Sequence, residues 1–127
     1  MSPYLNSLRY ALEGLQCAWK TERNFKLFVA LYILSFLLGW FLGITARDWQ
    51  VLIFTGSIFL AVELVNTALE NFADAFDTHS KSQNDHHTQA IKATKDIAAA
   101  ASLVCAIAWG AILVIILVPR MEYFVGW

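Results

Sequence analysis

Three long apolar stretches constrain this chain more than any other feature of its sequence. They cover roughly residues 25–44, 49–69 and 97–118. An α-helix of about 20 apolar residues crosses the ~30 Å hydrocarbon core of a bilayer. Inside that core each backbone amide must find its partner within the protein, which leaves the α-helix as the structure of a single span. The sequence therefore predicts an all-α integral membrane protein with three transmembrane helices.

The composition agrees with a membrane protein of one domain, residues 1–127. The chain is 58% hydrophobic and 15% charged, and its formal net charge is −1. Because the chain has no excess of basic side chains to neutralise phosphates, nucleic acid is not expected as a partner. Cys17 and Cys105 have no metal-ligand or redox spacing, and we interpret them as small apolar side chains.

Basic residues are distributed unevenly between the two sides of the predicted spans. The N-terminus and the polar segment at residues 71–96 fall on one side, and the short turn at 45–48 and the C-terminus fall on the other. The second side has Arg47 and Arg120, whereas the first side has seven basic residues: Arg9, Lys20, Arg23, Lys26, Lys81, Lys92 and Lys95. Cytoplasmic segments carry the excess of lysine and arginine. We therefore predict a protein of the cytoplasmic membrane with a cytoplasmic N-terminus and an external C-terminus.

Residues 1–24 have the pattern of an amphipathic helix. Apolar side chains share one face and charged side chains another, namely Leu5, Leu8, Leu12, Leu15 and Trp19 against Arg9, Glu13 and Lys20. Such a helix lies in the membrane interface with its apolar face toward the acyl chains. Packing against the cytoplasmic ends of the spans is the alternative, and the two interpretations are compatible.

A stripe of acidic and amide side chains follows the end of the second span. Asn66, Glu70 and Asp74 come three, seven and eleven residues after Glu63, so all four share one face of a helix that turns about 100° per residue. A solvated helix end would explain Asp74, but an ionisable side chain as deep as Glu63 is costly and indicates function. Carboxylate and amide oxygens are ligands that Mg²⁺ prefers. The stripe therefore predicts an active site.

Cationic partners for this stripe lie just before the third span. Lys92, Lys95 and Asp96 share a helix face, and lysine supplies a compact charge suited to a phosphate oxygen. A positive-inside anchor would explain both lysines but not Asp96. Glu22, at the inner edge of the first span, matters only if it meets the acidic stripe.

Small residues indicate how the spans pack. Ala98, Ser102, Ala106 and Gly110 repeat every fourth residue in the third span, and Gly39 and Gly43 are spaced likewise in the first. Such seams let helices approach closely. Because three spans alone bury little polar surface, a homo-oligomer that shares its acidic sites is expected.

Taken together, these residues resemble the prokaryotic diacylglycerol kinase and undecaprenol kinase family. The resemblance rests on the pattern ExxNxxxExxxD from Glu63 to Asp74, on Lys95-Asp96 with its run of small residues, and on residues 19–24 before the first span. It covers nearly the whole chain. It implies a homotrimer of three-span subunits, with a surface helix at 1–24 and spans at 25–44, 49–73 and 92–118 that have cytoplasmic extensions.

The resemblance also implies an activity and roles for single residues. The family phosphorylates a membrane lipid alcohol with MgATP, without a P-loop, at sites built between neighbouring subunits. By this resemblance Glu63 is the general base, Asn66 lies near the phosphates, and Glu22 and Glu70 bind the metal. Asp74 and Asp96 contact the nucleotide, and Lys95 contacts a phosphate.

Two features depart from the family pattern. The segment between Asp74 and Lys95 is longer than usual and contains His79, His86 and His87, which we interpret as solvated side chains of a loop rather than metal ligands. Phe28 stands where relatives often have histidine.

The sequence leaves the substrate and two other functions open. Diacylglycerol and undecaprenol are both possible acceptors. A small proton-coupled transporter or channel is an alternative, because an intramembrane glutamate also marks proton relays. A non-catalytic membrane adaptor with an interaction loop at 75–94 is another.

Overall fold

The computed structural model describes residues 3–80 and 85–125, with the side chains of residues 3–77 and 88–123. These residues form four helices and no strand: α1 (Pro3–Thr21), α2 (Arg23–Leu42), α3 (Ala46–Ser80) and α4 (Asp85–Val125). Three segments are long and apolar enough to cross a membrane, namely Arg23–Leu42, Ala46–Asp77 and Thr88–Tyr123. The prediction of an all-α protein with three candidate spans is confirmed.

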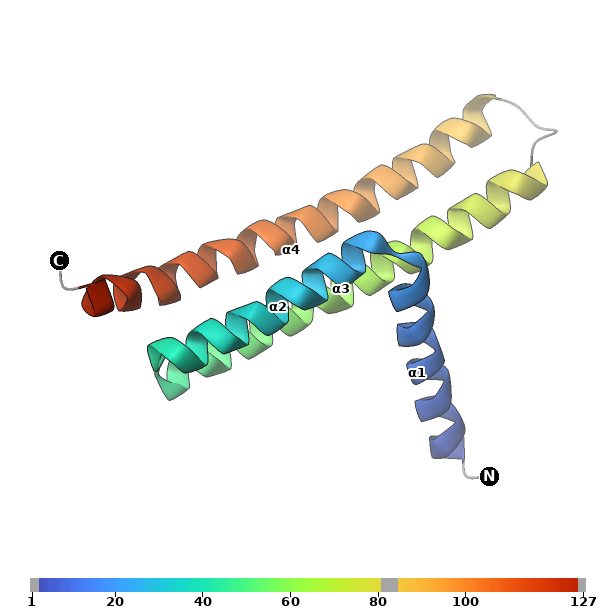
Figure 1. Cartoon of the computed structure of the whole chain (residues 1–127). Coiled ribbons are helices and arrows are strands. Elements are labelled where there is room, and N and C mark those ends of the chain that lie inside the picture. Colours follow the sequence, from blue (N-terminus) through green and yellow to red (C-terminus); the bar gives the residue numbers. More distant parts are fainter. Residues whose placement is uncertain (1–2, 81–84, 126–127) are drawn as a thin grey trace.

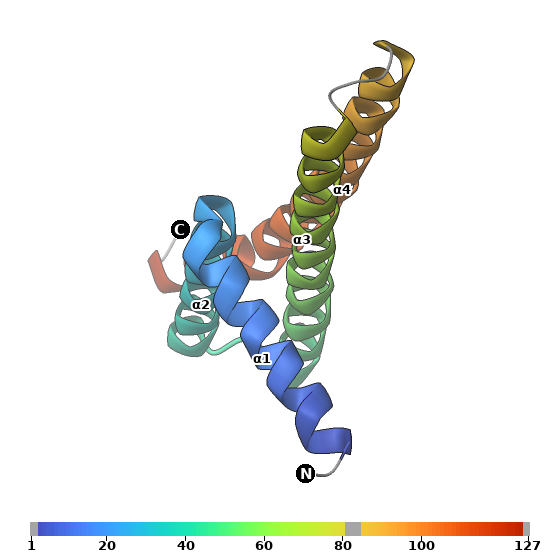
Figure 2. The same ribbon diagram turned by 90° about the vertical axis from the view of Figure 1, so that its right-hand side faces the viewer.

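The three spans run alternately in opposite directions (Figure 1). The turn between α2 and α3 lies at the same end of the molecule as the end of α4, and the end of α3 and the start of α4 lie at the other end (Figure 1). α3 and α4 have 35 and 41 residues against 20 in α2, so the hairpin extends well beyond the start of α2. α1 lies across one side of the spans (Figure 2). Which end faces the cytoplasm stays a prediction.

Gly43 ends α2 at the tight turn that precedes α3. Its backbone has the left-handed φ of 62°, which favours glycine. The N–H groups of Gly43 and Ile44 donate to the carbonyl oxygens of Trp40 and Gly39 at 3.3 and 3.2 Å. Two hydrogen bonds therefore close the last turn of α2, and the chain reverses its direction at this point.

Thr45 and Asp48 start α3 with a reciprocal set of hydrogen bonds. The N–H and hydroxyl of Thr45 donate to Asp48 Oδ2 at 2.9 and 2.7 Å, and the Asp48 N–H donates to the Thr45 hydroxyl at 3.2 Å. This arrangement satisfies amides that the first helical turn leaves without partners. The predicted turn at 45–48 was too long, because α3 begins at Ala46.

The polar segment between the second and third spans is mostly helical, and the loop expected at 75–94 is wrong. α3 continues to Ser80 and α4 begins at Asp85. Alanine, lysine and glutamine are strong helix formers, and packing between two helices stabilises both of them. Ala73 is buried in this region. The hairpin therefore presents its polar side chains on regular helices.

Two groups of buried side chains hold the spans together. Near the α2–α3 turn, the cluster consists of Leu42, Ile44, Leu52 and Ile116. Farther along, Phe59 of α3 is 1% exposed, and its ring centroid lies 4.8 Å from that of Phe28 in α2 and 5.5 Å from that of Trp109 in α4. These aromatic contacts fix the positions of α2, α3 and α4 relative to one another, close to the polar residues of α3.

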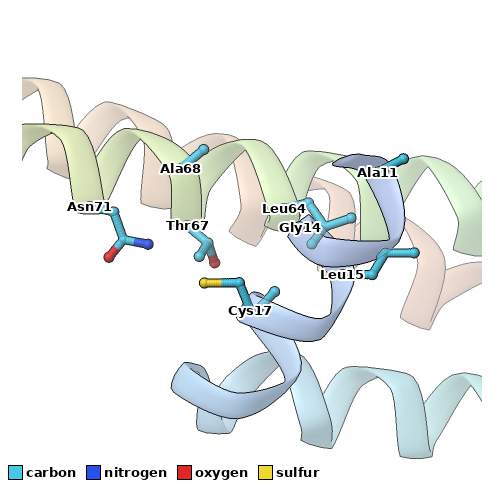
Figure 3. A pocket seen from close by; sticks show the side chains of 9 residues that line it. Ala11, Gly14, Leu15, Cys17, Leu64, Thr67, Ala68 and Asn71 are labelled. Atoms are coloured by element: carbon cyan, nitrogen blue, oxygen red, sulfur yellow. The ribbon is translucent and has the colours of Figure 1, made fainter. Parts of the chain in front are cut away.

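α1 is present as a helix and contacts α2. Together with α3 it lines a cavity of about 330 Å³, with Ala11, Gly14 and Cys17 on one side and Leu64 and Thr67 on the other (Figure 3). The large side chains of the predicted apolar face are exposed: Leu5, Leu8, Leu12, Leu15 and Trp19. The placement of α1 at the membrane surface stays a prediction.

Candidate active site

The middle of α3 directs three of the predicted site residues into one cavity. Glu63, Asn66 and Glu70 line a space of about 210 Å³. The other walls come from α2 and α4: Asn24, Phe28, Ala99, Ser102, Leu103 and Ala106. The spacing of three and four residues along α3 brings the three polar side chains to the same face. The cavity thus combines two carboxylates and an amide within the membrane-spanning part of the fold.

Glu63 is buried and bonded across the helix pair. Glu63 is 6% exposed, and its Oε2 accepts a hydrogen bond from the hydroxyl of Ser102 on α4. Ser102 is also 6% exposed. A buried carboxylate needs hydrogen-bond donors, because burial removes its water. The α3–α4 contact supplies one such donor.

Asn66 has one amide atom bonded and one available. Its Nδ2 donates to Glu70 Oε1 at 3.3 Å. Its Oδ1 is buried and has no hydrogen-bond partner among the described residues, although the residue is only 8% exposed. A buried acceptor without a partner costs about 1–3 kcal/mol. The cavity therefore holds an oxygen suited to a donor or a cation from outside the chain.

A second polar cavity lies farther along the hairpin, toward its tip. Lys95 Nζ and Asp74 Oδ1 form an ion pair at 2.6 Å between α4 and α3. Both line a space of about 230 Å³ together with Asp77, Thr88, Ile91, Lys92 and Asp96. Asp74 follows Glu70 by four residues, which is about 6 Å along the helix axis. The structure thus brings Asp74, Lys95 and Asp96 together, about one turn beyond the first cavity.

Glu22 is the predicted site residue that the structure keeps apart. It precedes α2 as its N-cap residue and lines neither cavity. Among the described residues there is no group of three His, Cys, Asp or Glu side chains that could hold a metal. The side chains of His79, His86 and His87 lie outside the described part of the chain.

An apolar groove adjoins the cavity of Glu63. It measures about 290 Å³ and shares two lining residues with that cavity, Phe28 and Ala106. Its other lining residues are Leu31, Phe59, Trp109, Gly110 and Leu113. Since Phe28 and Ala106 border both spaces, a molecule could occupy them together, with its polar group at Glu63 and its apolar part in the groove.

Sequence reasoning did not assign four polar residues that line these cavities: Asn24, Ser102, Asp77 and Thr88. Ser102 was noticed only as a small residue in the stripe of the third span. A hydroxyl group inside an apolar span seeks a hydrogen-bond partner, and this could have pointed to Ser102. Asp77 follows Asp74 by three residues on α3 and lines the same cavity, so helical spacing could have found it.

Known proteins match most of the chain. The family model described as prokaryotic diacylglycerol kinase matches residues 9–117. A protein of Helicobacter pylori (strain ATCC 700392 / 26695) named diacylglycerol kinase is 34% identical over 103 residues. These cover 81% of this chain and 75% of the length of the Helicobacter protein. A protein of Bacillus subtilis (strain 168) named undecaprenol kinase is 26% identical over 121 residues, 95% of this chain and 93% of its own. The matched residues include both polar cavities and the apolar groove.

Proposed function

The chain belongs to the prokaryotic diacylglycerol kinase family, and we propose that it transfers the γ-phosphoryl group of ATP to the hydroxyl of a membrane lipid alcohol. Membership makes it a membrane lipid kinase that uses a nucleotide as phosphoryl donor. The proposal adds ATP as that nucleotide and the cytoplasmic face as the place of reaction. Membership does not favour the transporter or channel considered as an alternative.

The buried Glu63 at the junction of polar and apolar spaces carries the proposal. A lipid alcohol has a hydroxyl at one end and hydrocarbon behind it, so it requires a polar site that continues into an apolar one. The cavity of Glu63 and the adjoining groove meet this requirement through Phe28 and Ala106. Glu63 is also the deepest carboxylate of α3 within the candidate span.

The proposed reaction needs one proton acceptor and an aligned nucleotide. The lipid hydroxyl oxygen forms a bond to the γ-phosphorus, the bond from that phosphorus to the β–γ bridging oxygen breaks, and ADP leaves with the electron pair. The hydroxyl proton passes to Glu63. In phosphoryl transfer the protein contributes chiefly alignment and charge neutralisation, so this chain has to supply a base and charged side chains that hold the nucleotide.

The charged cavity at the hairpin suits the nucleotide. Lys95 provides a cation for a phosphate oxygen, while Asp74, Asp77 and Asp96 provide acceptors for hydroxyl or amino groups. In the free protein the ion pair with Asp74 holds the Lys95 side chain over this cavity. We propose that ATP lies here, with its γ-phosphate toward the first cavity.

Glu70 and Asn66 fit a Mg²⁺ ion by their donor chemistry. Asn66 and Glu70 line the same cavity, and the Oδ1 of Asn66 has no partner among the described residues. Mg²⁺ in proteins takes one or two carboxylates together with phosphates and water. Bound there, the ion would neutralise phosphate charge. We propose a homotrimer in which Glu22 of a neighbouring subunit completes the set of oxygen ligands.

The acceptor lipid is diacylglycerol or undecaprenol in this proposal. The relatives are named for one or the other. The protein purified in detergent is expected to transfer label from radiolabelled ATP to one of the two when both are offered with Mg²⁺. A protein that labels neither lipid would contradict the proposal.

Glu63→Gln tests the role of the base. The amide keeps the size of the side chain but accepts no proton, so the rate is expected to fall about 100-fold or more. Glu122→Gln on the exposed end of α4 is the matched control and should leave the rate unchanged. Full activity of Glu63→Gln would remove Glu63 from its proposed role.

A further inference from the structure

The hydrogen bond between Ser102 and Glu63 joins the apolar part of α4 to the proposed base on α3. We infer that Ser102 is a positioning residue, which holds the Glu63 carboxylate in the orientation that receives the lipid hydroxyl. The inference rests on the proposed kinase function and deepens it. Both residues are buried, and the bond joins positions 39 residues apart in the chain.

Ser102 differs from most of the helical serine and threonine residues whose hydroxyl bonds are described. Ser57, whose hydroxyl group bonds that of Tyr32 in α2, is the other exception. Within a helix, serine and threonine hydroxyls usually donate to a carbonyl oxygen of the preceding turn. Five hydroxyl groups do so here: Ser7, Thr21, Ser35, Thr55 and Thr94. The Ser102 hydroxyl instead donates to a side chain of another helix. Its direction is therefore determined by Glu63 rather than by its own helix.

The surroundings of Ser102 make this contact possible. Ala98 and Ala106, one turn before and after it, are small, and Ala98 is buried. Small residues allow two helices to approach closely, which brings a side chain as short as serine within reach of α3. The small-residue stripe of α4 thus serves the site as well as the packing.

The bond leaves one carboxylate oxygen for chemistry. Ser102 donates to Oε2, so Oε1 keeps both of its lone pairs for the proton of the lipid hydroxyl. A glutamate has three side-chain torsions, and without this donor its carboxylate can rotate in the cavity. Misplacement of a reacting group by about 1 Å can lower a rate by about 100-fold, so a fixed carboxylate favours turnover.

The stability and kcat of Ser102→Ala distinguish a purely structural role of Ser102 from a positioning role. If the bond only holds α3 to α4, Ser102→Ala lowers stability and leaves kcat unchanged in the folded protein. If it positions the base, Ser102→Ala lowers kcat about 10- to 100-fold, while KM for ATP stays within about twofold. Ser102→Thr keeps the hydroxyl and is expected to recover most of the lost kcat.

The experiment measures kcat, KM for ATP and thermal stability of purified variants with the lipid that the wild type phosphorylates. Ser35→Ala is the matched control, because Ser35 is a buried serine of another span whose hydroxyl bonds the Tyr32 carbonyl of its own helix. It should leave kcat unchanged. In the Glu63→Gln background, Ser102→Ala should cause no further loss of the residual rate, because both changes act on the same step.

Each outcome decides between the possibilities. A wild-type kcat in Ser102→Ala overturns the inference and leaves the proposed function intact. Loss of activity in both Ser102→Ala and Ser102→Thr, with wild-type stability, also overturns it, because the hydroxyl would then not be what matters. If Ser102→Ala fails to fold, Ser102→Cys, of similar size and with a weaker donor, should show an intermediate kcat, and a wild-type kcat there overturns the inference. A wild-type protein without kinase activity overturns both the inference and the proposed function.

Discussion

The amide of Asn66 is divided between two functions. Its nitrogen bonds Glu70 within α3, and this bond directs the amide oxygen away from that carboxylate. The oxygen is buried and has no partner among the described residues. Native proteins rarely leave such an acceptor without a bond, which is consistent with the metal role proposed for Asn66.

Asn66→Ala tests the proposed metal role. The loss of one oxygen ligand should raise the Mg²⁺ concentration needed for half-maximal kinase activity about tenfold. The rate at saturating Mg²⁺ should fall less than that. A titration of activity with Mg²⁺ at fixed ATP measures both quantities.

Asn71→Ala is the control for this titration. Asn71 lies on the same helix, is exposed and lines the cavity toward α1 instead. It should leave the Mg²⁺ dependence unchanged. An unchanged Mg²⁺ dependence in Asn66→Ala would exclude Asn66 as a metal ligand.

Residues on a single helix could be placed from the sequence, and residues that meet across helices could not. Helical periodicity alone brings Glu63, Asn66 and Glu70 to one face, whatever the rest of the fold. The contact of Ser102 with Glu63 depends on the position of α4 along the axis of α3. The packing of large side chains such as Phe59 and Trp109 determines that position. No spacing within one helix contains that information.

At the scale of helices, the turn between α2 and α3 depends on one backbone conformation. Gly43→Ala is expected to destabilise the protein by about 1 kcal/mol, because a Cβ is disfavoured at a φ of 62°. Unfolding in mixed detergent micelles with increasing SDS, followed by tryptophan fluorescence, measures the change.

Gly14→Ala is the matched control for the turn. Gly14 lies within α1, where a Cβ would meet no atom within 4 Å. Alanine is the better helix former, so this change should leave the stability unchanged or raise it by up to about 1 kcal/mol. Equal destabilisation by both substitutions would show that the left-handed conformation is not the cause.

The apolar groove of α4 can be filled without disturbing the core. A Cβ at Gly110 would meet no atom within 4 Å, so Gly110→Leu places its side chain in the groove. If the lipid chain lies there, KM for the lipid should rise about tenfold while KM for ATP stays unchanged. Kinetics in mixed micelles with varied lipid fraction measures both constants.

Ala111→Leu is the control for the filled groove. Ala111 is exposed on the neighbouring position of α4 and does not line the groove. It should leave both KM values unchanged. An unchanged lipid KM in Gly110→Leu would place the hydrocarbon chain elsewhere.

The number and approximate position of the spans could be predicted because length and hydropathy determine them, but the ends of their helices could not. The start of α3 at Ala46 depends on hydrogen bonds between Thr45 and Asp48, two residues that hydropathy assigns to a turn. The polar hairpin was expected to be a loop because it is hydrophilic. Its helices form because helix propensity and the pairing of α3 with α4 do not depend on an apolar surface around them.

At the scale of the whole molecule, a single copy holds an incomplete set of the expected metal ligands. Glu70 and Asn66 share a cavity, whereas Glu22 precedes α2 outside it. A closed ring of three copies would repeat one contact between each subunit and the next. Glu22 of one copy could then meet Glu70 of another.

Mixed oligomers test whether sites are shared. Glu22→Gln and Glu63→Gln subunits, each inactive alone, should regain activity when they are unfolded and reassembled together. If each site takes Glu22 from one subunit and Glu63 from the next, random mixing of equal amounts restores about a quarter of the sites. Kinase assays across mixing ratios measure the recovery, and no recovery at any ratio would mean that each site lies within one subunit.

The unbroken course of α3 from Ala46 to Ser80 has a consequence for its place in the membrane. A helix rises about 1.5 Å per residue, so Glu63 and Asp74 are held about 16 Å apart along the axis. Bilayers differ in thickness, and a protein span adapts to them only by tilting or by deforming the lipid. The depth at which a lipid offers its hydroxyl therefore varies, while the distance from base to nucleotide cavity does not. Kinase turnover is therefore expected to depend on the thickness of the bilayer.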